Sequence, residues 1–315
     1  MDREIENAAC VTGTHTSGSG FKAGVYGSFA LPYYNTTAGI YQSFPFERAA
    51  AIPDPRCAVR GLHTAFVRSG AVVETYCFRG GRNYKARRTP RVKGCSSLKK
   101  IENERFALRN FARLLNANFK RNDPLLTFTL SDEGLRRVLD RVNGDPEKFM
   151  DRLRVEFRLF LDRARHAVRG KKWKRLRYVA IFSTVNGETG EAVRPHVHVI
   201  FRADCLRYNK REFYIGQQSL TDLWVLGAVD IRRVEDRDLS GVAAYLYRQA
   251  YHVEGKTAYM AARCLKRPRV IYDSASDESF ERAIAEAKAQ GCIIQEARRH
   301  RDGTYYMRYI DPGDD

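Results

Sequence analysis

The alternating segment VRPHVHVIF, residues 193–201, is the feature that most constrains the fold of this chain. Side chains along a β-strand point alternately to the two faces of its sheet. On a strand, His196 and His198 therefore share one face. The apolar residues on the opposite face, which we expect to be buried, are Val197, Val199 and Phe201. The segment predicts a strand that packs a core on one side and presents two imidazoles on the other.

The residues around this strand predict further elements in an order typical of an α+β fold. Asp145 and Pro146 are typical of a helix start, because a capping side chain is followed by proline at the first helical position. From hydrophobic periodicity, the predicted elements are a helix over 101–119, a strand over 125–130, a helix after 145, strands over 177–185 and 193–201, a strand over 228–234 and a helix over 239–253. We therefore expect an antiparallel central sheet flanked by helices, resembling the ferredoxin-like split βαβ arrangement.

Composition divides the chain into four regions. Residues 1–78 mix aromatic residues with turn formers, and we assign them no role. Residues 79–100 form a basic linker or arm, and residues 101–273 hold the elements described above. Residues 274–315 predict a C-terminal helix and a hairpin that turns at Asp302 and Gly303.

The formal net charge of +18 points to a polyanionic partner. Residues 79–100 contain many Lys and Arg and no acidic residue, so they are either a solvated linker or an arm that neutralises phosphates. In the second interpretation, Tyr84 is available to stack on a base. The expected DNA contacts are Arg87, Arg88, Arg91 and Lys93 of this segment, and Arg194 before the histidines.

Three features that the sequence lacks limit the kinds of protein that it can encode. The sequence contains no apolar run of roughly 18 residues, so we expect no membrane partner. The acidic N-terminus MDREIENAAC has no signal-peptide hydrophobic region. The seven cysteines are scattered, with none spaced as C-x-x-C, which favours reduced thiols over disulfides or structural zinc. We therefore expect a cytoplasmic protein.

The histidine pair has two interpretations. Two neutral imidazoles on one sheet face can bind one divalent metal ion together, and a strand holds them rigidly. Alternatively, His196 and His198 form a surface or hydrogen-bonded pair without metal. The strongly basic chain and a tyrosine-bearing helix downstream favour the metal interpretation.

The predicted helix over 239–253 contains a candidate nucleophile. Tyr245 and Arg248 are three residues apart, so both project from the same helix face. Near a metal-polarised phosphate, a tyrosine hydroxyl can attack phosphorus and stay covalently attached, while a guanidinium grips the phosphate oxygens. The alternative is an amphipathic helix with aromatic residues in the core, which we expect for Tyr247 and Tyr251.

Three motifs in this order resemble those of the HUH endonucleases, and within them the rolling-circle replication initiators of the filamentous-phage gene II and microvirus type. LLTFTLSD resembles the first-strand motif, RPHVHVIF the two-histidine metal motif, and YLYR the tyrosine motif. The resemblance covers roughly residues 96–273. It implies that residues 101–273 form an HUH endonuclease domain.

The resemblance implies a nickase that cuts single-stranded DNA at a replication origin. Mg²⁺ or Mn²⁺ held by His196 and His198 would polarise the phosphate, and Tyr245 would attack it. The products would be a 5′-phosphotyrosine link and a free 3′-hydroxyl, which primes a host polymerase. A host helicase would unwind the duplex, because the chain has no G-x-x-x-x-G-K-[ST] phosphate loop. The implied location is the cytoplasm of a bacterial host cell.

The sequence departs from the family pattern at two points. Many relatives have a glutamate as a third metal ligand near the end of the strand before the histidines, where this chain has Ser183. Arg248 replaces the usual lysine, and a guanidinium does not readily donate a proton. The possible substitutes for the third ligand are Glu188, Glu191 and Asp230.

Rival functions remain open at the level of sequence. A transposase or relaxase of the same superfamily would share the chemistry but not the biological substrate. A non-catalytic nucleic-acid-binding protein would need no metal and would form no covalent adduct. A zinc hydrolase would need third and fourth ligands, and the histidine motif supplies only two.

Overall fold

A computed structural model describes residues 61–80, 97–167, 176–186, 189–202, 204, 206–209, 212–215, 218–252, 257–273 and 279–313, all within one compact unit spanning Tyr41–Asp315. Several residues singled out above lie outside the described residues. They are Tyr84, Arg87, Arg88, Arg91, Lys93 and Glu188. No helix in the described ranges is long and apolar enough to cross a membrane.

The central sheet has five strands, and every pair of neighbours is antiparallel. In spatial order they are β10 (Tyr259–Ala261), β4 (Tyr178–Val185), β5 (Ala192–Phe201), β3 (Pro124–Thr129) and β9 (Val229–Arg233). The four longer strands lie where the sequence predicts them, whereas the three-residue β10 was not predicted. The expected α+β class with an antiparallel sheet flanked by helices is confirmed.

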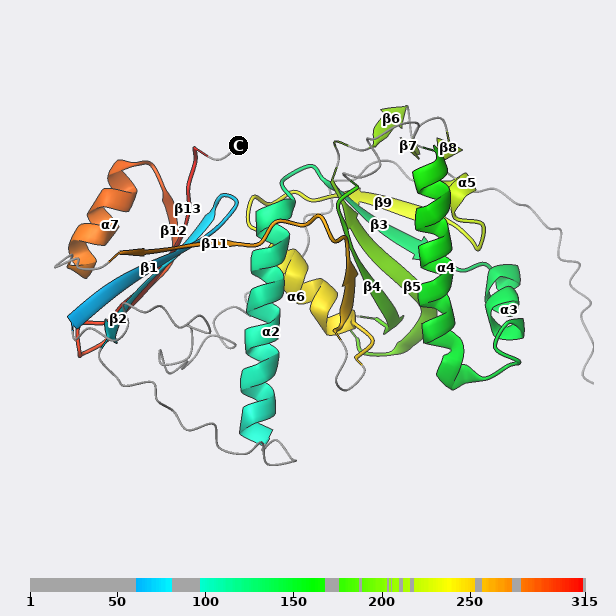
Figure 1. Ribbon diagram of the computed structural model, residues 1–315, viewed down its shortest axis with the longest axis horizontal. Helices are drawn as coiled ribbons and strands as arrows, with labels where there is room; N and C mark the ends of the chain where they lie inside the picture. The colour runs from blue at the N-terminus through cyan, green and yellow to red at the C-terminus, as the bar shows by residue number, and fades with distance from the viewer. Residues whose placement is uncertain are drawn as a thin grey trace, which may run out of the picture. The chain divides into compact units, whose positions relative to one another are not determined.

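Helices cover both faces of the central sheet (Figure 1). On one face, α4 (Pro146–Ala167) buries its apolar stripe against the side of β5 that carries Val197 and Val199. The helix starts as predicted, because the Asp145 carboxylate accepts a hydrogen bond from the Glu147 N–H at 3.0 Å. On the other face, α2 (Ser97–Asn118) and α6 (Ser240–Gln249) share an apolar cluster with β4. The histidines of β5 therefore lie on the face that α6 covers.

Close backbone contacts bring a loop against the end of β3. Here the Ser131 N–H donates to the Leu226 carbonyl at 2.9 Å, and the Thr129 N–H donates to the Ala228 carbonyl at 2.9 Å. A Cβ on Gly227 would lie 2.3 Å from the Thr129 carbonyl oxygen, so only glycine fits. Short elements complete this part of the fold: α3 (Asp132–Asp140), α5 (Leu220–Leu223), β6 (Arg207–Asn209), β7 (Glu212–Ile215) and β8 (Gln218–Ser219).

A second five-stranded antiparallel sheet, which we call the accessory sheet, combines strands from distant parts of the sequence. Its strands in spatial order are β11 (Arg269–Asp273), β1 (Gly61–Ser69), β2 (Val72–Gly80), β13 (Tyr305–Ile310) and β12 (Ile293–Arg299), and α7 (Phe280–Ala289) packs on it. The predicted hairpin turn is confirmed, since Gly303 has a φ of +84° between β12 and β13. The sequence-based boundary at residue 273 assigned β11 to the endonuclease domain, but β11 pairs with β1 of the accessory sheet.

Candidate active site

The two histidines occupy the middle strand of the central sheet. In the register of β5, His196 lies between Ser183 of β4 and Thr129 of β3. His198 lies two residues further along β5 on the same face, opposite Thr127 of β3. The three apolar residues of the opposite face, Val197, Val199 and Phe201, are each 0% exposed. The predicted alternation of β5 is therefore confirmed, with His198 buried and His196 half-buried.

The imidazole rings converge through their Nε2 atoms, which are 3.0 Å apart. The other ring nitrogen of each histidine is occupied. His196 Nδ1 lies 2.9 Å from the Arg194 carbonyl oxygen, and His198 Nδ1 lies 3.1 Å from Thr127 Oγ1. A carbonyl oxygen only accepts, so His196 carries its proton on Nδ1 and points a lone pair at His198. In metal-ligating histidines, one ring nitrogen is usually held by a protein group in this way while the other faces the metal.

Burial keeps His198 in the neutral form that a metal requires. The pKa of His198 is lowered to about 4, chiefly by removal from water and also by the neighbouring His196 and Arg232, while the hydrogen bond with Gln249 opposes this shift. Near neutral pH, His198 therefore needs to release no proton before its lone pair can bind a cation.

Gln249 of α6 places a third possible metal ligand, its side-chain oxygen, beside the histidines, and the sequence did not reveal it. Its side-chain oxygen lies 3.1 Å from His198 Nε2, and the residue is 2% exposed. Its amide nitrogen has no hydrogen-bond partner within the described residues. The available sequence signal was its position four residues after Tyr245, which brings both side chains to the same side of the helix. The family resemblance implies a carboxylate as third ligand, so it does not point to an amide.

Without a metal ion, the same contacts can be satisfied by hydrogen bonds. A proton on His198 Nε2 could be donated to His196 Nε2 or to the Gln249 oxygen, both within 3.1 Å. The buried amide nitrogen of Gln249 stays unsatisfied in either case. Geometry alone therefore supports both a metal site and a hydrogen-bonded pair.

Tyr245 is the tyrosine of α6 that meets the histidines. Its ring is half-buried, and its centroid lies 5.9 Å from that of His198 in an edge-on arrangement. Tyr247 instead packs near Phe111, with 6.2 Å between ring centroids, and burial raises the pKa of Tyr247. Tyr251, just after the helix, packs against the cluster on the opposite face of the sheet. Tyr247 and Tyr251 therefore pack against apolar clusters as expected, and Tyr245 also borders the cluster on which Tyr247 packs.

Arg248 and Arg194 lie at the surface. Arg248 is exposed, and its Nε donates to the Ala244 carbonyl one turn back in α6 at 3.3 Å. Arg194 donates to the Leu130 carbonyl at 3.0 Å and pairs with Asp132 at 2.5 Å. Arg194 therefore joins β5 to the start of α3, while about half of its side chain stays accessible.

Of the three carboxylates proposed as third ligands, the two that the structure describes, Asp230 and Glu191, do not join the histidine pair. Asp230 shares a row of the sheet with Thr127 and His198, but Thr127 separates it from the histidine, and Asp230 is exposed beside Arg232. Glu191 accepts a hydrogen bond from Thr189 in the preceding turn and lies about 16 Å along the chain from the first histidine at strand spacing.

Ser183, which stands where relatives have a glutamate, is fully buried and bonds to the backbone of Val185. Within the described residues, no three His, Cys, Asp or Glu side chains gather as a metal cage. The third donor beside the pair is therefore an amide oxygen. In the comparisons with known proteins, the chain matches no family model, no curated protein and no solved structure.

Proposed function

We propose that this protein is a metal-dependent endonuclease that cuts single-stranded DNA through a covalent tyrosine intermediate. One observation carries the proposal: two imidazole nitrogens 3.0 Å apart lie beside the Gln249 oxygen and the ring of Tyr245. The proposed biological role is that of an HUH-type initiator of rolling-circle replication. Its partners would be origin DNA, a host polymerase and a host helicase.

The order of the central sheet supports an HUH-like core. The strands β4, β5, β3 and β9 are neighbours in that order, and α4 connects β3 to β4. An antiparallel ferredoxin-like sheet, with strands numbered by sequence, has the order 2-3-1-4. The same order is found here, and both histidines stand on β5, one of its two middle strands.

The donor set fits a divalent cation. Two imidazole nitrogens and one amide oxygen leave coordination positions open for phosphate oxygens and water. Imidazole is a softer ligand than a carboxylate, so we expect Mn²⁺ to bind more tightly than Mg²⁺. The unpartnered amide nitrogen of Gln249 is consistent with an oxygen that is oriented toward a ligand.

The proposed reaction exchanges one phosphoester for another. When bound, the metal ion would withdraw electron density from the scissile phosphate. The Tyr245 oxygen forms a bond to phosphorus as the bond from phosphorus to the 3′-oxygen breaks. The phenol proton leaves to solvent, and the 3′-oxygen takes up a proton to become a free hydroxyl. A guanidinium does not readily give up a proton, so the role proposed for Arg248 is to hold phosphate oxygens by charge.

A covalent-adduct assay tests the proposal. The protein is incubated with a pool of single-stranded DNA containing its own origin strand, with Mn²⁺ or with EDTA, and adducts are separated on a denaturing gel. We expect a metal-dependent adduct that is lost in Tyr245→Phe and in the double variant His196→Ala/His198→Ala. Tyr247→Phe is the matched control and should form the adduct normally.

A second function is favoured by the hydrogen bonds that the histidines can make without metal. In that case the chain is a nucleic-acid-binding protein whose histidines and Gln249 form a structural network. Tight DNA binding that is unchanged by EDTA, with no adduct in any condition, would support it.

A further inference from the structure

The start of α6 is held by side chains from outside the helix. The Asp238 carboxylate accepts hydrogen bonds from the Ser240 N–H at 3.0 Å and from the Ser240 hydroxyl at 2.7 Å. Asn116 of α2 donates to the same carboxylate at 3.1 Å and accepts from the Leu239 N–H at 2.8 Å. Leu239, the N-cap residue, provides no side-chain bond of its own. The orientation of the helix start therefore depends on Asp238 and its partners.

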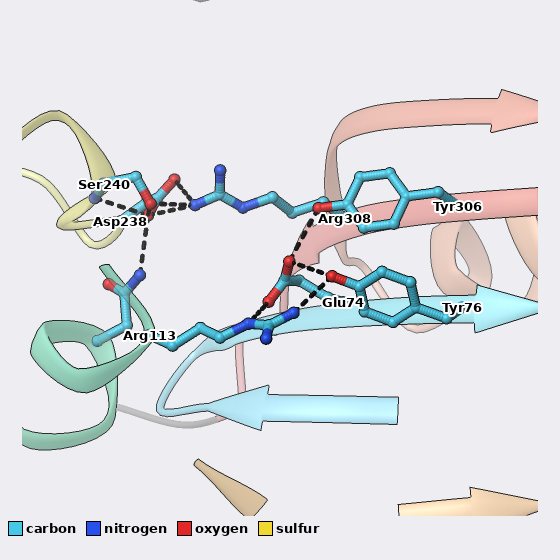
Figure 2. A network of polar contacts seen from close by, with 8 residues as sticks. Glu74, Tyr76, Arg113, Asp238, Ser240, Tyr306 and Arg308 are labelled. Atoms are coloured by element: carbon cyan, nitrogen blue, oxygen red, sulfur yellow. Dashed lines mark hydrogen bonds and ion pairs between the residues drawn. The ribbon is translucent and has the colours of Figure 1, made fainter. Parts of the chain in front are cut away.

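Arg308 of β13 connects the accessory sheet to Asp238, which we call the anchor of α6 (Figure 2). One guanidinium nitrogen of Arg308 lies 2.7 and 2.6 Å from the two oxygens of Asp238, and it also contacts the Ser240 hydroxyl. Both charged side chains are only 13% exposed. Contacts between charged groups are strong when water is excluded, so this pair ties the C-terminal hairpin to the start of α6.

A second buried pair, Glu74 and Arg113, connects the accessory sheet to α2, and within the described residues neither side chain has a hydrogen bond to α6. Glu74 of β2 accepts from Arg113 at 2.5 Å, from Tyr76 at 2.8 Å and from Tyr306 at 3.0 Å. Figure 2 shows the two networks side by side, with Arg113 directed to Glu74 and Arg308 directed to Asp238. Arg113 and Arg308 are each 13% exposed. The two arginines are therefore equally buried, but Arg308 contacts Ser240 of α6, whereas the hydrogen bonds of Arg113 go to Glu74 and Tyr76.

We propose that Arg308 is a positioning residue for Tyr245. The inference rests on the proposed function, because Tyr245 has to meet a phosphate next to the histidines. Arg308 does not touch the histidines in this arrangement; it acts by fixing Asp238 and, through it, the axis of α6. The C-terminal hairpin thereby becomes a part of the catalytic unit.

The geometry predicts which property changes when the anchor is lost. The other end of α6 stays attached, because the Tyr251 N–H donates to the Phe182 carbonyl at 2.8 Å. The helix would tilt about that end, where Gln249 lies, so the metal ligands move little. Tyr245 lies about 9 Å from that end, so a tilt of about 10° would displace it by about 1.6 Å. A misplacement of about 1 Å can slow a reaction about 100-fold.

The test compares Arg308→Met with Arg113→Met in single-turnover adduct formation at saturating DNA and Mn²⁺, below the unfolding temperature of both variants. For Arg308→Met we expect a rate about 100-fold below wild type, with Mn²⁺ affinity within threefold of wild type. For Arg113→Met we expect a rate and an affinity within threefold of wild type. Arg308→Lys, which keeps one charged donor, should recover part of the rate.

Three results would overturn the inference: a wild-type rate in Arg308→Met, an equal loss of rate in Arg113→Met, or a loss of Mn²⁺ affinity equal to the loss of rate. If Arg308→Met does not fold, Asp238→Asn makes the same comparison, since it keeps the acceptor for Ser240 and removes the charge that holds Arg308. A wild-type protein that forms no adduct refutes the proposed function itself, so the two failures are distinguishable.

Discussion

Replacing His198 with asparagine should make the stability of the protein less dependent on pH between 7 and 5. The pKa of His198 is about 4 in the folded protein, against an ordinary value of 6.5. Between these values the unfolded chain binds more protons than the folded one, so stability falls as the pH falls. From the two pKa values, His198 alone should account for a loss of about 2 kcal/mol between pH 7 and pH 5.

Urea unfolding in EDTA at the two pH values measures this contribution. Asparagine keeps a polar atom near Thr127 but does not titrate, so the wild type should lose about 2 kcal/mol more than His198→Asn on acidification. His166→Asn, a substitution of an exposed histidine on α4, is the control for general effects of removing a histidine. Equal losses in wild type and His198→Asn would show that His198 is not buried in the neutral form that the proposed metal site requires.

Three further predictions concern the ligand set, the junction and the fold. Gln249→Glu should bind Mn²⁺ at least about tenfold more tightly and Gln249→Leu at least about tenfold more weakly, by isothermal titration, because a carboxylate adds charge and leucine removes the donor; equal affinities would exclude Gln249 as a ligand. Glu74→Gln should destabilise the protein by about 3 kcal/mol in urea unfolding, because Arg113 is left buried without its carboxylate, and a loss below about 1 kcal/mol would contradict this. Gly227→Ala should lower the melting temperature by several degrees, since its Cβ would meet a backbone oxygen at 2.3 Å that cannot move aside, and an unchanged melting temperature would refute the close approach.

The central sheet was predictable because its signals are local. The period-two alternation of residues 193–201 gave the strand, its buried face and the shared face of the histidines. The Asp145-Pro146 pair gave the start of α4, which its capping bond confirms. The strand β10 has three residues, too few for a periodic pattern, and its existence depends on pairing with β4.

The accessory sheet could not be predicted from local patterns. Alternation identifies a strand but not its partner, and β2 pairs with β13, whose residues are more than 220 positions away in the sequence. The Arg308–Asp238 pair could not be predicted for the same reason, because its members are 70 residues apart in the sequence. Only the folded chain brings these side chains together.

The candidate site was predicted in part. His196, His198 and Tyr245 were identified from residue type and spacing, and the structure brings their rings together. Gln249 was not identified, because an amide on a helix becomes a candidate ligand only when the helix packs against the histidine strand. Glu191, one of the possible third ligands, lies in the turn before β5, and the extended backbone of the strand separates it from the pair.

The most direct measurement of the central claim is to map the residue that becomes attached to DNA. Protein incubated with its origin strand and Mn²⁺ would be digested with nuclease and protease, and the peptides analysed by mass spectrometry. We expect a nucleotide phosphate on Tyr245, present with Mn²⁺ and absent with EDTA. An adduct on Tyr247 or Tyr251, or no adduct with DNA that the protein binds tightly, would contradict the assignment of Tyr245 as the nucleophile beside a metal-binding histidine pair.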